Sequence, residues 1–288
     1  MAEDSGAGSS REEETLKEDA ELEPFVRLIE ALEPWLEQVV LIGGWAHRLY
    51  RLDPRAQTLT YPALTTLDSD IAVPLKIEAK ETSIRDRLLA AGFREEFVGE
   101  DRPPATHYHL VGQGGFYAEF VSPLVGSEYG RKGERKVSRE VGGISSQQLR
   151  YIEILLLAPW HISLNKTNGY PFKSTKHVRV ANPVSFLSQK ILIQDVRDRK
   201  DRAKDILYIH DTIEIFAGHL AELRELFAKE LRPKLQAKKA REVSNAADAL
   251  FGHVDDTVRD AVQMVVGRKL SPEALTETCR AGLKAILL

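Results

Sequence analysis

Apolar residues recur along the first part of the chain with periods that predict a helix, a strand and a second helix. Helical spacing relates Phe25, Leu28, Ile29, Leu32 and Leu36, so we expect ordered structure to start near Pro24. Residues 39–42 are all apolar and predict a buried strand. Gly43-Gly44 ends that strand, and residues 45–50 open the second helix.

A polar segment then separates this unit from the next strand. Residues 53–66 contain two prolines and several threonines and predict a loop. Residues 67–73 alternate, with Leu67, Ser69, Ile71 and Val73 on one face, so they predict a strand with one buried side. Residues 79–91 suit an amphipathic helix that Gly92 caps.

The middle of the chain predicts a hairpin followed by shorter strands. Residues 106–111 and 116–121 are strand-like, and the glycine-rich residues 112–115 form the turn between them. Residues 126–143 are rich in glycine and charge and predict a loop. Short strands are expected around residues 150–157 and 176–180.

Beyond residue 182 the periodicity is helical throughout. It predicts helices over residues 184–196, 202–217, 219–230, 234–251, 254–266 and 272–287. We therefore predict an α+β fold in which a mixed α/β domain of residues 24–182 precedes an all-helical domain of residues 183–288. Residues 1–23 are rich in Glu, Asp, Ser and Gly and predict a disordered acidic tail.

Composition narrows the class of protein. The hydrophobic fraction of 43% is enough for buried cores, and the formal net charge of −3 favours no particular partner. No apolar run reaches the roughly 20 residues that span a bilayer, so we expect no membrane contact. Cys279 is the only cysteine, which excludes a disulfide framework and favours the cytoplasm.

Three acidic residues predict a metal site. Asp68 and Asp70 are two positions apart on a strand and point the same way, roughly 6–7 Å apart. Glu119 is the one acid within an otherwise apolar strand, where a carboxylate is costly unless it is paired or metal-bound. If the two strands pair, all three can hold Mg²⁺ or Mn²⁺. The alternative is that all three are solvated residues of an edge strand and a hairpin.

The glycine turn predicts an anion site. Gly43 and Gly44 let a ligand approach the backbone, and the following helix points amide groups at it. This suits a triphosphate, although no P-loop or dinucleotide-binding fingerprint is present. A tight strand-to-helix turn without a ligand is the alternative.

The ordered combination resembles a known family. Residues 39–46 (VVLIGGWA), followed by residues 66–71 (TLDSDI), resemble the opening of the polymerase-β-type nucleotidyltransferase fold, and most closely the group of AbiEii-type toxins and their relatives. The resemblance implies a nucleotidyltransferase-like mixed sheet flanked by helices. It places Trp45 with Gly43 and Gly44 in nucleotide binding, and Glu119 as the third acid, where Asp is commoner.

The resemblance extends to residues 183–190 (PVSFLSQK) and 197–205 (RDRKDRAKD). It implies that Lys190 contacts the nucleotide phosphates and that Asp205 orients the catalytic centre. Taken alone, Lys190 would be an ordinary helix lysine with its amine in water. An insertion of about a dozen residues, 53–64, departs from the family pattern.

The implied activity is metal-dependent transfer of a nucleoside monophosphate from a nucleoside triphosphate, ATP among them, to RNA, a protein or a small molecule. A toxin–antitoxin or phage-defence role with an antitoxin partner would follow from the family. Two alternatives stay open: a non-catalytic nucleotide- or RNA-binding module that retains the fold, and a helical interaction protein that acts through residues 183–288.

Other motifs are weaker. His107 and His109 share a strand face, but no third nitrogen or sulfur ligand lies at useful spacing, so we expect surface or pocket-lining histidines. The basic residues 131–139 could steer an RNA acceptor, and the basic residues 229–241 predict a solvated helix face. Cys279 is expected to be a buried residue of the last helix.

Overall fold

The computed structural model describes residues 22–98, 105–112, 115–129, 137–235, 237–265 and 267–288. Residues 1–21 of the predicted acidic tail lie outside the described residues. The chain forms two compact units. The first contains the chain up to Gly44, Thr65–Leu149 and Ser163–Arg179, and the second contains Trp45–Leu64, Arg150–Ile162 and Val180–Leu288.

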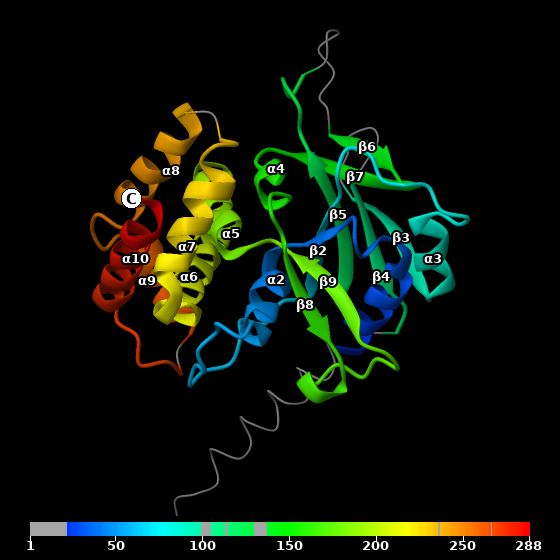
Figure 1. Ribbon diagram of the computed structural model, residues 1–288, viewed down its shortest axis with the longest axis horizontal. Helices are drawn as coiled ribbons and strands as arrows, with labels where there is room; N and C mark the ends of the chain where they lie inside the picture. Colours follow the sequence, from blue (N-terminus) through cyan, green and yellow to red (C-terminus); the bar gives the residue numbers. More distant parts are fainter. Residues whose placement is uncertain (1–21, 99–104, 113–114, 130–136, 236, 266) are drawn as a thin grey trace, which may run out of the picture. The chain divides into compact units, whose positions relative to one another are not determined.

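A mixed sheet forms the first unit. Its main path runs β3-β4-β5-β2-β1-β9-β8, and β7 pairs with both β5 and β6 (Figure 1). The strands are β1 (Val40–Leu41), β2 (Asp68–Ala72), β3 (Phe93–Val98), β4 (Ala105–Leu110), β5 (Tyr117–Pro123), β6 (Ser138–Val141), β7 (Ile144–Leu149), β8 (Trp160–Leu164) and β9 (Lys176–Val180). Only the last two residues of β8 belong to this unit.

Parallel and antiparallel pairs alternate around the middle of the sheet. β2 runs antiparallel to β1 and parallel to β5. β5 also pairs antiparallel with β4 and parallel with β7. β2 is therefore a central strand, with a neighbour hydrogen-bonded on each side.

Helices flank this sheet. The first helix covers residues 22–31, and Phe25, Leu28 and Ile29 on its inner face are fully buried, as their spacing predicts. α3 (Ile84–Ala90) packs against β3. The short 3-10 turns η1 (Glu33–Trp35) and η3 (Lys166–Asn168) complete the unit.

The second unit is mainly helical. Its elements are the end of α2 (Gly43–Leu49), η2 (Tyr50–Leu52), α4 (Ile152–Leu155), α5 (Pro183–Leu192), η4 (Gln194–Val196), α6 (Arg199–Ile215), η5 (Ala217–His219), α7 (Leu220–Leu226), the π-helical turn η6 (Phe227–Leu231), α8 (Ala237–Leu250), α9 (Asp256–Gln263) and α10 (Pro272–Leu287). All six helices predicted beyond residue 182 are present. Cys279 is fully buried in α10, which confirms its expected place.

Aromatic side chains build the core of the second unit. The Tyr50 ring lies edge-on to Phe186 and to Phe216, with ring centroids 5.8 Å and 5.7 Å away. Its hydroxyl donates a hydrogen bond of 2.7 Å to the carbonyl of Ala181. α6 packs against α9 and α10, so the last helices of the chain cover the helix that carries Asp205.

The division differs from the predicted domain limits. The last segment of the second unit starts at Val180, near the predicted boundary at residue 182, but the unit also takes residues 45–64 and 150–162. Tertiary contacts explain this. Gln57, within the 53–64 insertion, donates its backbone amide to the carbonyl of Ile215 at the end of α6, over 2.9 Å.

Several local predictions are wrong. Residues 150–157 form α4 rather than a strand, because a short apolar run does not distinguish the two. Ser138–Val141 within the predicted loop pairs as β6, and β3 was not predicted because its sequence FREEFV is half charged. The helix predicted over residues 79–91 begins only at Ile84, because the Ser83 side chain caps it. Leu67 is 46% exposed rather than buried.

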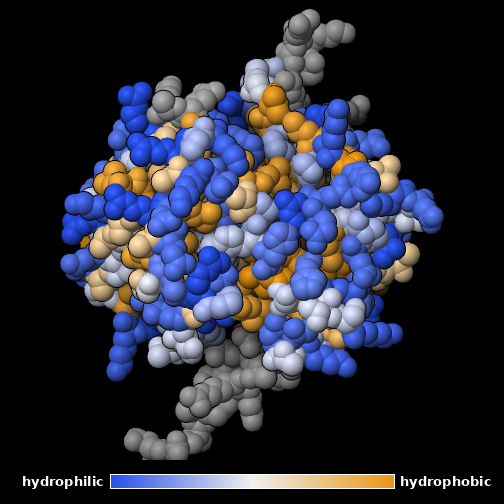
Figure 2. All heavy atoms as spheres, viewed as in Figure 1, coloured by the Kyte–Doolittle hydropathy of each residue, from blue (hydrophilic) through white to orange (hydrophobic). Residues whose placement is uncertain are grey.

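Within the described residues, no helix combines the length and the apolar character that a membrane span requires. On the face drawn in Figure 2, hydrophilic and hydrophobic residues are interspersed.

Candidate active site

Strand β2 presents two carboxylates on one side. Ser69 and Ile71 are fully buried on one face of the sheet. Asp68 and Asp70 alternate with them, so both acids point to the opposite face, where they are half-buried. The hydrophobic alternation of the strand thus fixes the direction of both acids. Their side chains share one open face of a central strand, as the sequence predicts.

Strand β5 brings the third acid beside them. β2 and β5 pair in parallel, and Asp70 is the register partner of Glu119. Neighbouring strands lie about 4.8 Å apart, so these two acids are adjacent on the same face. The strand pairing on which the prediction for Glu119 depended is therefore present. His107 approaches from β4, with its Nε2 atom 3.7 Å from Glu119 Oε2.

The glycine turn lies directly against the aspartates. Gly43 has a φ of 60°, and a Cβ atom added there would overlap Asp70 Oδ2. A Cβ atom on Gly44 would lie 2.6 Å from Thr66 Cγ2. Only glycine fits at both positions, because Asp70 and Thr66 occupy the space of a side chain. The turn and the Asp-x-Asp strand, which are more than 20 residues apart in the sequence, form one surface.

Thr66 is a site residue that the sequence analysis did not single out. Its hydroxyl is buried and donates a hydrogen bond to Asp68 Oδ1. The threonine two positions before the first aspartate was the available signal, because hydroxyl-bearing residues often bond polar groups two residues away. Thr66 therefore orients the carboxylate of Asp68 and packs on Gly44 at the same time.

Three rings lie on the same face beyond Glu119. His107 stacks on Tyr117, with ring centroids 4.4 Å apart and an interplanar angle of 13°. His109 lies 5.4 Å from the Tyr117 ring, and its Nε2 atom is 2.8 Å from Glu96 Oε2. Burial and the neighbouring His109 lower the pKa of His107, so its ring is uncharged at neutral pH. Both histidines are partly exposed on the strand surface, which agrees with the predicted surface position.

Lys190 and Asp205 belong to the second unit and form a buried ion pair. The Lys190 amine donates to Asp205 Oδ1, and both side chains are about 5% exposed. Arg197 Nε lies 3.5 Å from the other carboxylate oxygen. The Lys190 amine is also 5.2 Å from the Tyr208 ring centroid. The alternative of an ordinary lysine with its amine in water is wrong, since a buried lysine requires a partner of this kind.

Trp45 is the first residue of the second unit and is fully buried. The guanidinium of Arg48 lies over its ring, 5.1 Å from the centroid. The indole therefore serves as a packed anchor for the helix that follows the glycine turn. Its predicted part in nucleotide binding stays a prediction.

A second acidic group lies on α6. Within the described part of the chain, His210, Asp211 and Glu214 are the one trio of potential ligands whose donor atoms all lie within 4.8 Å of one another. Arg268 donates to both oxygens of Asp211 over 2.8 Å. Burial alone raises the pKa of Asp211, but the hydrogen bond with His210 and the nearby cations hold that pKa below its usual value. The guanidinium already supplies a positive charge to this trio, which therefore forms an ion-pair network within the second unit.

The acids on the sheet also carry ligands of the type that divalent ions take. Asp68, Asp70 and Glu119 supply only carboxylate oxygens, the ligands that Mg²⁺ and Mn²⁺ prefer. Their oxygens are not drawn together as closely as those of the trio on α6.

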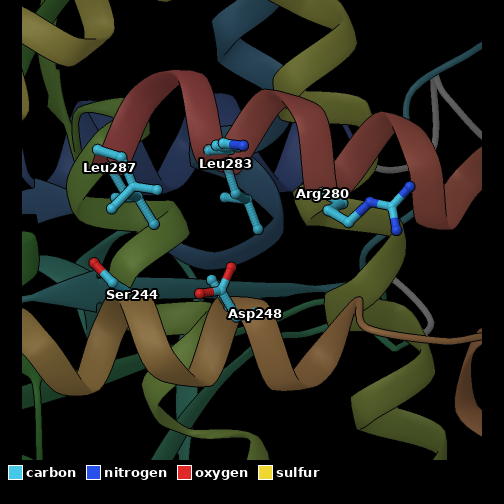
Figure 3. A pocket seen from close by; sticks show the side chains of 8 residues that line it. Ser244, Asp248, Arg280, Leu283 and Leu287 are labelled. Carbon is cyan, nitrogen blue, oxygen red and sulfur yellow. The ribbon is translucent and has the colours of Figure 1, made fainter.

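A cavity between α8 and α10 is too small for a substrate. Figure 3 shows Ser244 and Asp248 on one helix facing Arg280, Leu283 and Leu287 on the other. The cavity has a volume of about 10 Å³, which is room for one water molecule at most.

Comparison with known proteins agrees with this geometry. A family model described as nucleotidyltransferase matches residues 21–232, which include the glycine turn, all three acids of the sheet, Lys190 and Asp205. No curated protein matches the chain. The matched region is well over half of the 288 residues, and the chain belongs to this nucleotidyltransferase family.

Proposed function

We propose that this protein transfers a nucleoside monophosphate from a nucleoside triphosphate to an acceptor, with Asp68 and Asp70 as ligands of Mg²⁺ or Mn²⁺. The observation that carries the proposal is the position of Asp70. Its carboxylate lies against Gly43 on one side and beside Glu119 on the other. A triphosphate on the glycine turn would thus meet the metal ligands directly.

The carboxylates would act through the cations that they bind. Bound Mg²⁺ would neutralise the phosphates and activate the attacking oxygen. Thr66 fixes the orientation of Asp68, and the close packing of Gly43 fixes that of Asp70. Because phosphoryl-group transfer depends mainly on positioning and electrostatic stabilisation, such fixed acids are the main contribution of the first unit.

The glycine turn would bind the β- and γ-phosphates. α2 begins at Gly43, so its first backbone amides are without partners inside the helix and can donate to phosphate oxygens. The absence of side chains at Gly43 and Gly44 permits close approach. We assign Trp45 to the support of this turn and include it in the nucleotide site.

Lys190 and Asp205 form the buried ion pair to which we assign a second role. We propose that Lys190 neutralises phosphate charge and that Asp205, aided by Arg197, holds the lysine amine in place and orients the catalytic centre. The burial of the pair supports this, because the ion pair with Asp205 holds the lysine amine in one position.

The acceptor and the biological role are further proposals. RNA, a protein and a small molecule remain acceptors of equal standing at this point. The resemblance to the AbiEii-type group supports a toxin-like or phage-defence role in the cytoplasm, with an antitoxin as the partner. A single cysteine, which is buried, suits a reducing compartment.

A labelling experiment tests the activity. The purified protein is incubated with Mg²⁺, total RNA and each α-³²P-labelled nucleoside triphosphate, and the products are separated on a gel. We expect label in RNA or protein that Asp68→Ala and Asp70→Ala abolish without a change in melting temperature. Both side chains are on the open face of the sheet, so neither variant leaves a cavity in the core.

The result also separates the alternatives. Transfer at full rate by either aspartate variant would refute the metal assignment. Binding of a triphosphate without any transfer would favour a non-catalytic nucleotide-binding module. A partner protein captured equally well by wild type and Asp70→Ala, with no triphosphate binding, would favour a helical interaction protein.

A further inference from the structure

Two rows of side chains cross the open face of the sheet on strands β2, β5, β4 and β3. Register partners on paired strands share a face, so the rows follow directly from the pairing. One row is Asp70, Glu119, His107 and Glu96; the other is Asp68, Tyr117, His109 and Arg94. In each row an acidic residue is therefore followed by a ring on the neighbouring strand: Tyr117 beside Asp68, and His107 beside Glu119.

Three rings, those of His107, Tyr117 and His109, lie together on this face. On β4 the alternate residues Thr106, Tyr108 and Leu110 are buried. The side chains of His107 and His109 remain 19% and 35% exposed. His107 and His109 are 6.0 Å apart, and each contacts Tyr117. The result is a partly exposed patch of π-faces and ring edges. We call these three residues the ring platform.

The ring platform and the glycine turn lie on opposite flanks of β2. The sheet order β4-β5-β2-β1 puts the platform on the β5 side, while Gly43 follows directly after β1. If the triphosphate occupies the glycine turn, the other reactant must approach Asp68 and Asp70 from the β5 side. The platform is then the surface that this reactant meets first.

We propose that the ring platform is the acceptor subsite and that it stacks a nucleobase of an acceptor strand. This inference rests on the proposed transfer reaction and names its acceptor class. A planar base suits rings because every base has a π-face, and the stacked rings of His107 and Tyr117 offer it a flat partner. Arg94, exposed at the end of one row, can contact the strand's phosphates.

A binding experiment tests the subsite without the need for catalysis. Fluorescence anisotropy compares two labelled single strands in Mg²⁺: an rA₁₂ oligonucleotide and a 12-mer of the same phosphates without bases. We expect the wild type to bind the strand with bases about tenfold more tightly, the effect of one stacked base. Equal binding of the two strands by the wild type would overturn the proposal.

Variants locate the effect. His107→Gln and Tyr117→Leu should each remove most of the preference for bases, whereas Tyr117→Phe, which keeps the ring, should retain it. His177→Ala is the matched control, an exposed strand histidine on β9 of the same unit. Binding of Mg²⁺ and a triphosphate should be unchanged in the two Tyr117 variants and in His177→Ala. A full preference for bases in both ring-deleted variants would overturn the proposal.

Asp70→Ala separates this inference from the proposed reaction. If the reaction is correct, this variant loses transfer but keeps its preference for the strand with bases. If the wild type shows the preference and no transfer with any triphosphate, the platform stands and the reaction falls. If the wild type transfers to a protein or a small molecule and ignores bases, the reaction stands and the platform falls.

Discussion

Substitution of Gly43 by alanine should damage the site far more than the fold. An added methyl group at Gly43 would overlap the side chain of Asp70, which has to shift to make room. The backbone cost is that of alanine at a φ of 60°, about 1–2 kcal/mol. The carboxylate must move to make room, and a displacement of about 1 Å at a reacting centre lowers the rate about 100-fold.

Gly169→Ala provides the matched control. Gly169 has a φ of 90°, and an added Cβ atom there would have no neighbour within 4 Å. It ends η3 in the same unit, so its variant carries comparable backbone strain without any contact at the site. The two variants should therefore unfold at similar urea concentrations, about 1–2 kcal/mol below the wild type.

Two assays then compare the pair. Electron paramagnetic resonance measures Mn²⁺ binding, and single-turnover labelling measures transfer. We expect Gly43→Ala to bind Mn²⁺ more weakly and to lose about 100-fold in rate, and Gly169→Ala to match the wild type in both. Wild-type Mn²⁺ affinity and rate in Gly43→Ala would refute the inferred contact between the glycine turn and Asp70. Equal losses in both variants would show that strain alone accounts for them.

Three further predictions concern the second unit and the sheet. Arg268→Ala should lower the free energy of unfolding by about 3–5 kcal/mol in urea, because it leaves Asp211 buried and charged without its cation; Arg259→Ala, which removes an exposed pair, should change it by less than about 1 kcal/mol. Burial holds the pKa of His47 at about 4 against its ordinary 6.5, so the folded state binds fewer protons between these values. The free energy of unfolding, measured in urea, should be highest above pH 6.5 and should fall by about 2 kcal/mol between pH 7.5 and pH 5. An equal fall at low pH in His47→Phe would contradict this. Thr66→Val should reduce transfer with little change in melting temperature, and unchanged transfer would refute its role in orienting Asp68.

The sequence was informative where one periodicity dominates. The alternation around Asp68 and Asp70 predicted which way both acids face, because Ser69 and Ile71 must enter the core. The long helices beyond residue 182 were predicted for the same reason. The sequence did not predict β3, because three of its six residues are charged. β3 is an edge strand, and its hydrogen bonds to β4 rather than burial of its side chains stabilise it.

Contacts between distant segments could not be predicted in the same way. Nothing local relates Gly43 to Asp70 or Gly44 to Thr66, since those contacts depend on how β1 and β2 pair. The parallel register of β2 with β5 was stated only as a condition for Glu119. Local patterns determine which face a residue occupies, whereas strand pairing determines its neighbours, and a site requires both.

The insertion of residues 53–64 shows how distant contacts can give a segment an unexpected role. Its sequence predicts a loop, yet the Tyr61 hydroxyl donates to Asp211 and Glu214, and the Arg268 guanidinium lies over the Tyr61 ring, 3.8 Å from its centroid. The Gln57 side chain donates to the carbonyl of Glu214 over 2.6 Å. α6 carries Asp205 together with Asp211 and Glu214, so the insertion packs on the same helix as the proposed phosphate-binding pair. We therefore regard the insertion as a brace for α6 rather than a mobile lid.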